Sequence, residues 1–492
     1  MNALLRRSAI PAVTTAVCAA VGLAIPLNEQ VAVTIAFAAV GVCAFAAPTA
    51  AWVASAVIAA LTFRALSTLG ILPEVAAYFD IPLAWGALLV ALSKRRPVSP
   101  GAARHLRVLL LLLAAVAMSW LFNLSEVLRP VAYAALLAAP FAVVGALLLD
   151  PPTRTQRRLL VNVAAALAAV QVPLMYGQYF AFGGGDRMQG TLYGAGGGAH
   201  LTSAILLLSC VWYFTRDRGD ISWRSLAALI PVLVLPILAD AKQVVAVMPA
   251  VALAWTRHGS RSGWFTRAAL GGVVATVLFL FVPAAHTGLA MLKDAQSANK
   301  GKVAETEFVW ARISADPASL VFGKGPAETV SRAAFLTTNY FGPSPLHVLG
   351  LRPARVPLEA EAKVASNSNV VSGSSGRFVV GSSINSALSS ALGILGDLGV
   401  LGVLVYGTLY LTVVRDLYRS TDRLASPAMA GWIMFAILGF LFDWWEQPPF
   451  ALFVALLSGL ALAPQRDVPV VPRVEGYWRP SSHVRASVTR ST

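Results

Sequence analysis

Charged residues are scarce in this sequence. Only 12% of its 492 residues are Asp, Glu, Lys or Arg, whereas 57% are hydrophobic and the mean hydropathy is +0.69. A soluble domain carries about 25% charged residues. The composition therefore excludes an ordinary soluble protein and indicates an all-α polytopic membrane protein.

Cysteine is also rare, and the positions of the three cysteines argue against a zinc site and a disulfide framework. Cys18, Cys43 and Cys210 lie within hydrophobic segments and lack the spacing of zinc ligands, so we expect no disulfide framework. The sequence contains no HExxH pattern and no cluster of Cys and His. Outside a long polar region at residues 286–388, the carboxylates expected on the outer face are scattered over separate segments. We therefore expect no metal and no other cofactor.

The net charge of +15 could suggest a nucleic-acid partner. However, most basic residues outside the long polar region sit in short loops between apolar segments, as membrane topology alone requires. We therefore expect membrane lipids, and no nucleic acid, as partners of these cations.

Fourteen apolar segments are candidates to cross a bilayer, since a spanning helix needs about 20 residues. They lie near residues 8–27, 29–47, 48–66, 75–93, 107–124, 127–149, 158–181, 199–215, 225–239, 243–256, 265–285, 388–414, 427–442 and 449–464. The first could pass for a signal peptide, but apolar segments follow it at once. We therefore expect a retained helix and about fourteen transmembrane helices.

Clusters of basic residues predict which loops share a side of the membrane. They occur at residues 6–7, 94–107, 154–158, 216–224, 257–267, 415–423 and 466–490. Every interval between successive clusters contains an even number of candidate spans, so all clusters fall on one side. The positive-inside rule makes that side cytoplasmic. Both termini are then cytoplasmic, and the protein belongs in the inner (cytoplasmic) membrane.

The same pattern divides the chain into five regions. Residues 1–150 form N-terminal transmembrane helices, and residues 151–285 form transmembrane helices joined by outer loops that carry cations. Residues 286–388 form a large extracytoplasmic loop, with helical patterning near 303–315 and 326–336. Residues 389–464 return to the membrane. Residues 465–492 form a polar cytoplasmic tail that we expect to be disordered.

Two outer segments carry cations suited to binding an anion. Arg187 lies in the glycine-rich stretch GGGDRMQGTLYGAGGGAH, where it could grip an anion with its planar guanidinium or simply pair with Asp186 in solvent. Lys242 lies between two apolar segments of only about 14–15 residues, each rising about 21–23 Å at 1.5 Å per residue. The hydrocarbon is about 30 Å thick, so this turn should be recessed. Lys242 either neutralises Asp240 there or supplies charge at the floor of a pocket.

The long loop and the helix after it supply the remaining candidates. His347 is the best candidate for a base near neutral pH, although it could be an ordinary surface histidine. Asp397 lies a few turns inside the apolar segment that follows the loop, where it could act in catalysis or only pair within the bundle. Its neighbours Gly393, Gly396, Gly399 and Gly402 are spaced for close helix packing.

Four features together resemble the superfamily of O-antigen ligases and O-antigen polymerases, which assemble bacterial envelope glycans. They are Arg-x-x-Gly at 187–190, a short hairpin bearing Lys242, an FGxGP turn at 322–326, and an acid-x-Gly-x-x-Gly pattern beginning at Asp397. The resemblance covers roughly residues 155–460. Members commonly have Arg where this chain has Lys242, and many have His-Asn where it has Ile384-Asn385.

The resemblance implies transfer of a polyprenyl-diphosphate-linked glycan to the hydroxyl of a glycan or lipid acceptor. It implies that Arg187 and Lys242 bind the diphosphate and that Arg332 or Arg377 closes over it. His347, as the base, and Asp397 are the expected catalytic residues. A secondary transporter or a flippase for lipid-linked oligosaccharides is the main alternative. We see no internal repeat of the kind such transporters carry. A non-catalytic membrane scaffold is the third class, but it would not need recessed cations.

Overall fold

The computed structural model describes twelve stretches of the chain. They are residues 47–94, 96–193, 197–216, 223–241, 243–244, 247, 306–329, 331–337, 370–372, 378–380, 389–441 and 444–464.

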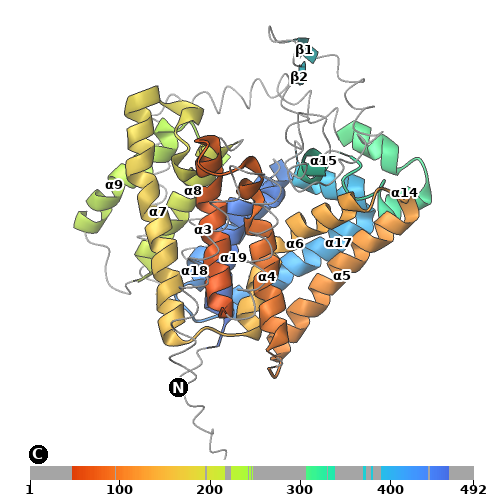
Figure 1. The fold of residues 1–492 in the computed structure, drawn as a ribbon, viewed down its shortest axis with the longest axis horizontal. Coiled ribbons are helices and arrows are strands. Elements are labelled where there is room, and N and C mark those ends of the chain that lie inside the picture. Colours follow the sequence, from red (N-terminus) through yellow and green to blue (C-terminus); the bar gives the residue numbers. More distant parts are fainter. Residues whose placement is uncertain are drawn as a thin grey trace, which may run out of the picture.

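Helices dominate these residues, and the longer ones run side by side as a bundle (Figure 1). The α-helices are α3 (Thr49–Thr68), α4 (Asp80–Ser93), α5 (Pro100–Asn123), α6 (Leu128–Leu149), α7 (Arg154–Phe182), α8 (Gly198–Arg216), α9 (Trp223–Leu238), α14 (Pro317–Phe322), α15 (Arg332–Thr337), α17 (Ser390–Arg419), α18 (Ala425–Leu441) and α19 (Pro448–Leu462). The short 3₁₀ helices are η1 (Glu74–Tyr78), η2 (Gly185–Arg187), η3 (Gly190–Leu192) and η5 (Trp444–Glu446).

The region predicted to be a long loop is partly helical, as expected. Residues 306–313 are helical, and α14 and α15 follow. The strands β1 (Val370–Ser372) and β2 (Phe378–Val380) pair antiparallel, with Val371 opposite Val379. This hairpin was not predicted, although valine favours strands.

Five of the described helices, α3, α5, α6, α7 and α17, are long and apolar enough to cross a membrane. Five more apolar helices, α4, α8, α9, α18 and α19, are shorter. Large apolar side chains on the outside of the bundle, such as Leu110 and Leu404, are more than half exposed. Exposed apolar surface of this extent marks contact with lipid or another protein. The chain is a membrane-embedded protein.

These ten helices coincide with ten of the fourteen segments expected to span the membrane. The other four, near 8–27, 29–47, 243–256 and 265–285, lie wholly or mainly outside the described residues. The total of fourteen stays a prediction.

Local sequence explains where several helices begin. Ser99 accepts a hydrogen bond from the backbone N–H of Ala102, and Pro100 supplies the first residue of α5. Thr153 and Gln156 form a reciprocal capping box at the start of α7. Such caps satisfy backbone donors that have no partner within the helix.

Helix α6 lies at the centre of the bundle and packs against α4, α5 and α19. Most of its residues are buried, which fits a helix that is largely apolar on every side. Phe141 stacks on Trp432 of α18 at 5.3 Å between ring centroids and meets Tyr406 of α17 edge-on at 5.6 Å. These aromatic contacts join α6 to the C-terminal helices.

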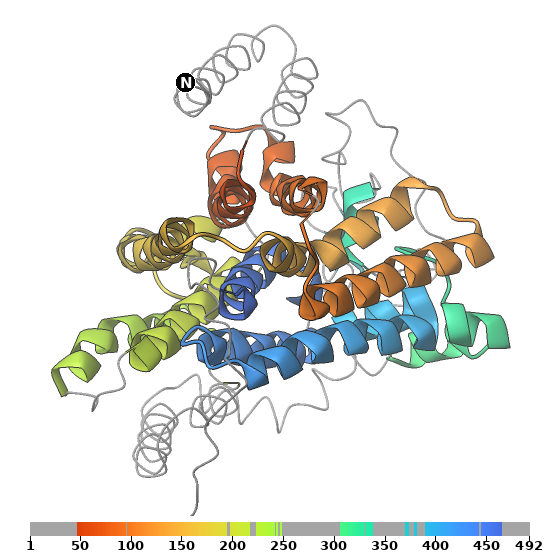
Figure 2. The ribbon, with the colours of Figure 1, turned by 90° about the horizontal axis from the view of Figure 1, so that it is seen from below.

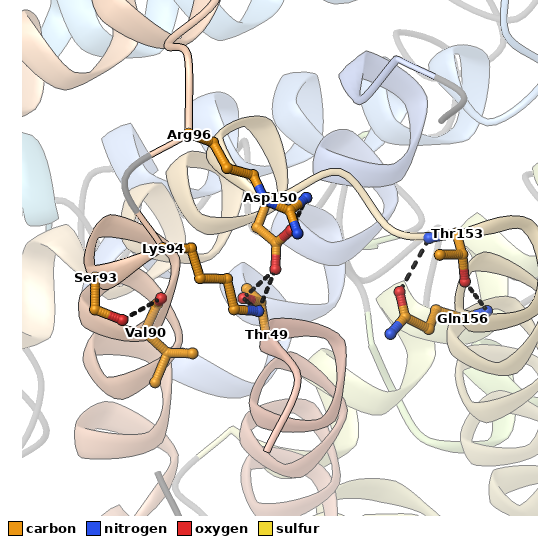
Figure 3. A network of polar contacts seen from close by, with 8 residues as sticks. All are labelled: Thr49, Val90, Ser93, Lys94, Arg96, Asp150, Thr153 and Gln156. Atoms are coloured by element: carbon orange, nitrogen blue, oxygen red, sulfur yellow. Dashed lines mark hydrogen bonds and ion pairs between the residues drawn. The ribbon is translucent and has the colours of Figure 1, made fainter. Parts of the chain in front are cut away.

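One end of the bundle gathers cations from sequence clusters that were predicted to share a side, and we call it the cation-rich end. Asp150 pairs with Lys94 and with Arg96, the latter at 2.6 Å, and accepts a hydrogen bond from Thr49 at 2.7 Å (Figure 3). Partial burial alone would raise the pKa of Asp150, but the hydrogen bonds from Lys94 and Thr49 and the nearby cations hold this pKa below its usual value.

Two further ion pairs tie distant segments together at this end. Arg104 contacts Asp416 at 2.6 Å, and Arg157 contacts Asp422 at 2.6 Å. The basic clusters around 94–107, 154–158 and 415–423 therefore meet at one end, as the span counting requires. Their assignment to the cytoplasm stays a prediction.

Candidate functional site

At the opposite end, residues 316–329 and 331–337 pack onto the bundle, and we call this the loop end. Helices α5 and α17 run side by side toward it (Figure 2), and α14 packs against α17 and the end of α5. The FGxGP turn, residues 322–326, begins at the last residue of α14 and meets α17 at an internal break.

The break in α17 occurs at Gly399, whose φ of 67° and ψ of −165° are not helical. A break of this kind leaves backbone carbonyls without their usual partners within the helix. Here the turn supplies the donors: the N–H of Lys324 binds the carbonyl of Gly396 at 2.8 Å, and the N–H of Gly325 binds that of Asp397 at 3.2 Å. The loop therefore completes the hydrogen bonding of the membrane helix.

Glycine is required on both sides of this contact. A Cβ placed on Gly323, whose φ is 74°, would lie 2.3 Å from the backbone carbon of Asp397. A Cβ placed on Gly399 would lie 2.4 Å from the carbonyl oxygen of Val321. Both distances are far below van der Waals contact, so the two backbones can touch only because both residues lack a side chain.

The end of α5 covers the same contact from a third direction. The hydroxyl of Ser119 donates to the carbonyl of Asp397 at 2.7 Å, and the amide of Asn123 donates to the carbonyl of Gly323 at 3.3 Å. Phe122 stacks on Phe322 with ring centroids 4.0 Å apart. The turn is therefore fixed by polar and apolar contacts at once.

The Asp397 side chain, a predicted catalytic residue, is fully buried beneath the loop. Its Oδ1 accepts hydrogen bonds from both the backbone N–H, at 2.8 Å, and the hydroxyl of Thr329. Its Oδ2 has no hydrogen-bond partner among the described residues. The hydrogen-bond partner of this carboxylate is therefore Thr329 of the loop, and a catalytic role for Asp397 stays a prediction.

Further charged contacts hold the loop on either side of Thr329. Arg129 at the start of α6 forms a largely buried ion pair with Glu328. The backbone N–H of Arg332, a predicted diphosphate ligand, donates to Glu446 of η5. Glu446 is only 2% exposed. The structure thus brings Asp397 and Arg332 into one polar cluster.

Sequence reasoning did not single out Arg129, Thr329 or Glu446. Arg129 lies at the start of an apolar segment, and Glu446 follows Trp445 and is separated from a pair of prolines by Gln447. A charge at the edge of an apolar run is the signal that could have marked both residues.

Arg187 lies elsewhere, in the glycine-rich loop between α7 and α8. It is exposed, and its guanidinium donates to the carbonyl of Phe182 at 3.1 Å, while Asp186 lies 3.4 Å from His200. This loop packs against the end of α9: a Cβ on Gly184 would lie 2.9 Å from the carbonyl oxygen of Leu238. No contact joins Arg187 to the cluster around Asp397 within the described part of the chain.

The turn expected to be recessed is covered by this loop. Ala239 and Ala241 are buried, and Asp240 between them has a φ of 54°. Met188 and Met175 pack against Leu235 in the same apolar cluster. The Arg187 loop therefore sits over the residues that immediately precede Lys242.

Three predicted site residues, Lys242, His347 and Arg377, lie outside the described residues. Within the described ranges, no three His, Cys, Asp or Glu side chains gather in a way that could hold a metal ion.

No protein-family model matches this chain, and no curated protein matches it significantly in sequence.

Proposed function

We propose that this protein transfers a polyprenyl-diphosphate-linked glycan to an acceptor hydroxyl at the outer face of the cytoplasmic membrane. The observation that carries the proposal is the docking of the turn 322–326 on the break of α17. It brings together the two patterns on which the resemblance to O-antigen ligases and polymerases chiefly rests, 322–326 and Asp397–Gly402, although 70 residues of sequence separate them.

The chemistry needs fixed positive charge near the bilayer surface. The acceptor oxygen bonds to the anomeric carbon as the bond from that carbon to the diphosphate oxygen breaks. Polyprenyl diphosphate leaves with the electron pair, and the acceptor proton passes to a base, for which His347 is the proposed residue. Arg187, Lys242, Arg332 and Arg377 are proposed to stabilise the departing diphosphate, and direct displacement inverts the anomeric centre.

The two described arginines proposed for this task lie in different parts of the structure. Arg187 is exposed above the end of α9, and Arg332 begins α15. In this proposal the loop end faces outward, where lipid-linked glycans are consumed, and the cation-rich end with both termini faces the cytoplasm.

The test is transfer by purified protein from a lipid-linked glycan to a hydroxyl acceptor. Arg187→Ala and Arg332→Ala should each lower the rate by about ten- to a hundredfold, since a hydrogen bond to a charged group contributes about 1.5–3 kcal/mol. Arg187→Lys should restore little, because a point charge does not reproduce the planar guanidinium.

Arg107→Ala is the matched control, since Arg107 is exposed on α5 near the cation-rich end. It should leave transfer within about twofold, as expected for a surface substitution. Normal transfer by the Arg187 and Arg332 variants would contradict the cationic mechanism. A dependence on Mg²⁺ or Mn²⁺ after EDTA treatment would contradict it as well.

A further inference from the structure

We propose that Asp397 and Glu446 are positioning residues that together hold the loop, at Thr329 and at Arg332, against the membrane bundle. Two carboxylates from separate elements, α17 and η5, accept hydrogen bonds from Thr329 and from the backbone of Arg332. The consequence for transfer rests on the proposed function, in which the side chain of Arg332 contacts the diphosphate.

Asp397 is placed for anchoring rather than for proton transfer to a substrate. Its side chain has no exposed surface, and Thr329 of the loop contacts the carboxylate directly. One oxygen takes both donors of Thr329, while the other makes no hydrogen bond within the described residues. A carboxylate used in this way serves only as an acceptor, and one oxygen is enough for that task.

Glu446 holds the loop at Arg332. The element that carries it is itself fixed, because the backbone N–H of Trp445 donates to Ser390 at 3.1 Å and the indole of Trp445 donates to the carbonyl of Phe435 at 2.7 Å. The carboxylate of Glu446 then accepts the N–H of Arg332, only three residues after Thr329. The backbone from which Arg332 extends is therefore held from two sides.

A third contact strengthens this arrangement next to Thr329. Arg129 of α6 and Glu328 form an ion pair in which both side chains are largely buried. Breaking such a pair by removing one partner leaves a buried charge without compensation. The three carboxyl contacts thus draw α6, α17 and η5 onto one short stretch of the loop.

Anchoring and proton transfer predict different results for conservative substitutions. In Asp397→Asn the amide oxygen can still accept from Thr329, and the amide nitrogen replaces an oxygen that makes no hydrogen bond within the described residues. Glu446→Gln likewise keeps an acceptor for the N–H of Arg332. A residue that exchanges a proton with substrate would lose its function in either change.

The first measurement is the docking of the loop, which requires no enzymatic activity. Ser331→Cys introduces a thiol at a position only 6% exposed, in a background without the native cysteines. Its rate of maleimide labelling in purified protein should rise at least tenfold with Asp397→Ala or Glu446→Ala. With Asp397→Asn or Glu446→Gln the rate should stay within threefold of the parent.

Asp416→Ala is the matched control. Asp416 lies on the same helix as Asp397, but it pairs with Arg104 at the cation-rich end. Its removal should leave the labelling of Ser331→Cys unchanged. Should Asp397→Ala fail to fold, Thr329→Val removes the hydroxyl donor from the loop side and should also speed labelling.

The second measurement is transfer by the same variants. The alanine variants of Asp397 and Glu446 should lose at least tenfold in rate, and the Asn and Gln variants should keep at least a third of the activity. Slow labelling in folded alanine variants would overturn the proposal, as would loss of transfer in Asp397→Asn with the loop still docked. Fast labelling in the alanine variants, with no transfer even by the parent, would overturn the proposed function and leave the anchoring intact.

Discussion

At the scale of single residues, Asp316 fixes the beginning of α14. Its carboxylate caps α14 by accepting from the backbone N–H and the hydroxyl of Ser319 at 2.7 and 2.6 Å, and Lys324 lies 3.3 Å away. The hydrogen bonds from Ser319 and the nearby charge of Lys324 lower the pKa of Asp316 from the usual 3.8 to about 2. The cap therefore favours the ionised carboxylate.

This pKa gives a pH dependence of known sign. Because the pKa of Asp316 is lower in the folded state, its contribution to the stability of α14 is complete above about pH 4 and is lost as the pH falls through about 2. Limited digestion with pepsin should cut α14 faster in Asp316→Ala than in wild type at pH 4. The difference should shrink toward pH 2. A difference that stays constant with pH would show that the carboxylate does not act as an ionised cap.

At the scale of elements, the main departure from expectation is the break in α17. The spacing of Gly393, Gly396, Gly399 and Gly402 predicted close packing of helices. In the structure, α17 packs along α5, but at two of these glycines the close approach is to the loop: Gly399 meets Val321, and a Cβ on Gly396 would lie 2.9 Å from Thr329. The spacing of glycines shows that one face of the helix lacks side chains, but it does not show which segment packs against that face.

The break predicts a contrast between glycines on the same helix. Gly399→Ala places a Cβ against the loop backbone at a positive φ and should destabilise the folded protein by roughly 1–3 kcal/mol. Gly407→Ala has open space around its Cβ and should stabilise by about 0.5–1 kcal/mol. Thermal unfolding in detergent measures both. A neutral Gly399→Ala would contradict the contact between turn and helix.

The helices themselves were largely predictable, whereas the contacts of the site were not. Apolar runs and caps such as Ser99 and Thr153 locate the helices, since both signals are local. The cluster around Asp397 depends on Thr329 and Glu446, which lie 68 and 49 residues away in sequence. No local pattern encodes such pairings, because they arise only when three elements pack together. The family resemblance marked Asp397, but it did not supply the partners of this residue.

At the scale of the whole molecule, the two ends of the bundle differ in chemistry. Ion pairs such as Arg104–Asp416 and Arg157–Asp422 gather at one end, and the loop docks at the other. The charge pattern of the sequence predicted that the basic clusters and the loop lie at opposite ends, since Lys and Arg are enriched in the loops on one side of a membrane.

Sidedness can be measured with single cysteines at exposed positions. A membrane-impermeant thiol reagent added to intact cells should label Ala318→Cys, on α14 at the loop end, and should spare Thr421→Cys near the cation-rich end. Both should react once the membrane is permeabilised. The opposite pattern would place the loop in the cytoplasm and exclude the proposed reaction, whose substrate lies outside.

The two hydrogen bonds at the break in α17 also constrain how the chain is built. A helix entering lipid must satisfy its backbone groups from within the protein, and the carbonyls of Gly396 and Asp397 do so through the loop. The ribosome makes residues 322–326 before it makes α17. The donors are therefore already synthesised when the broken helix inserts, so the order of synthesis matches the order that assembly requires.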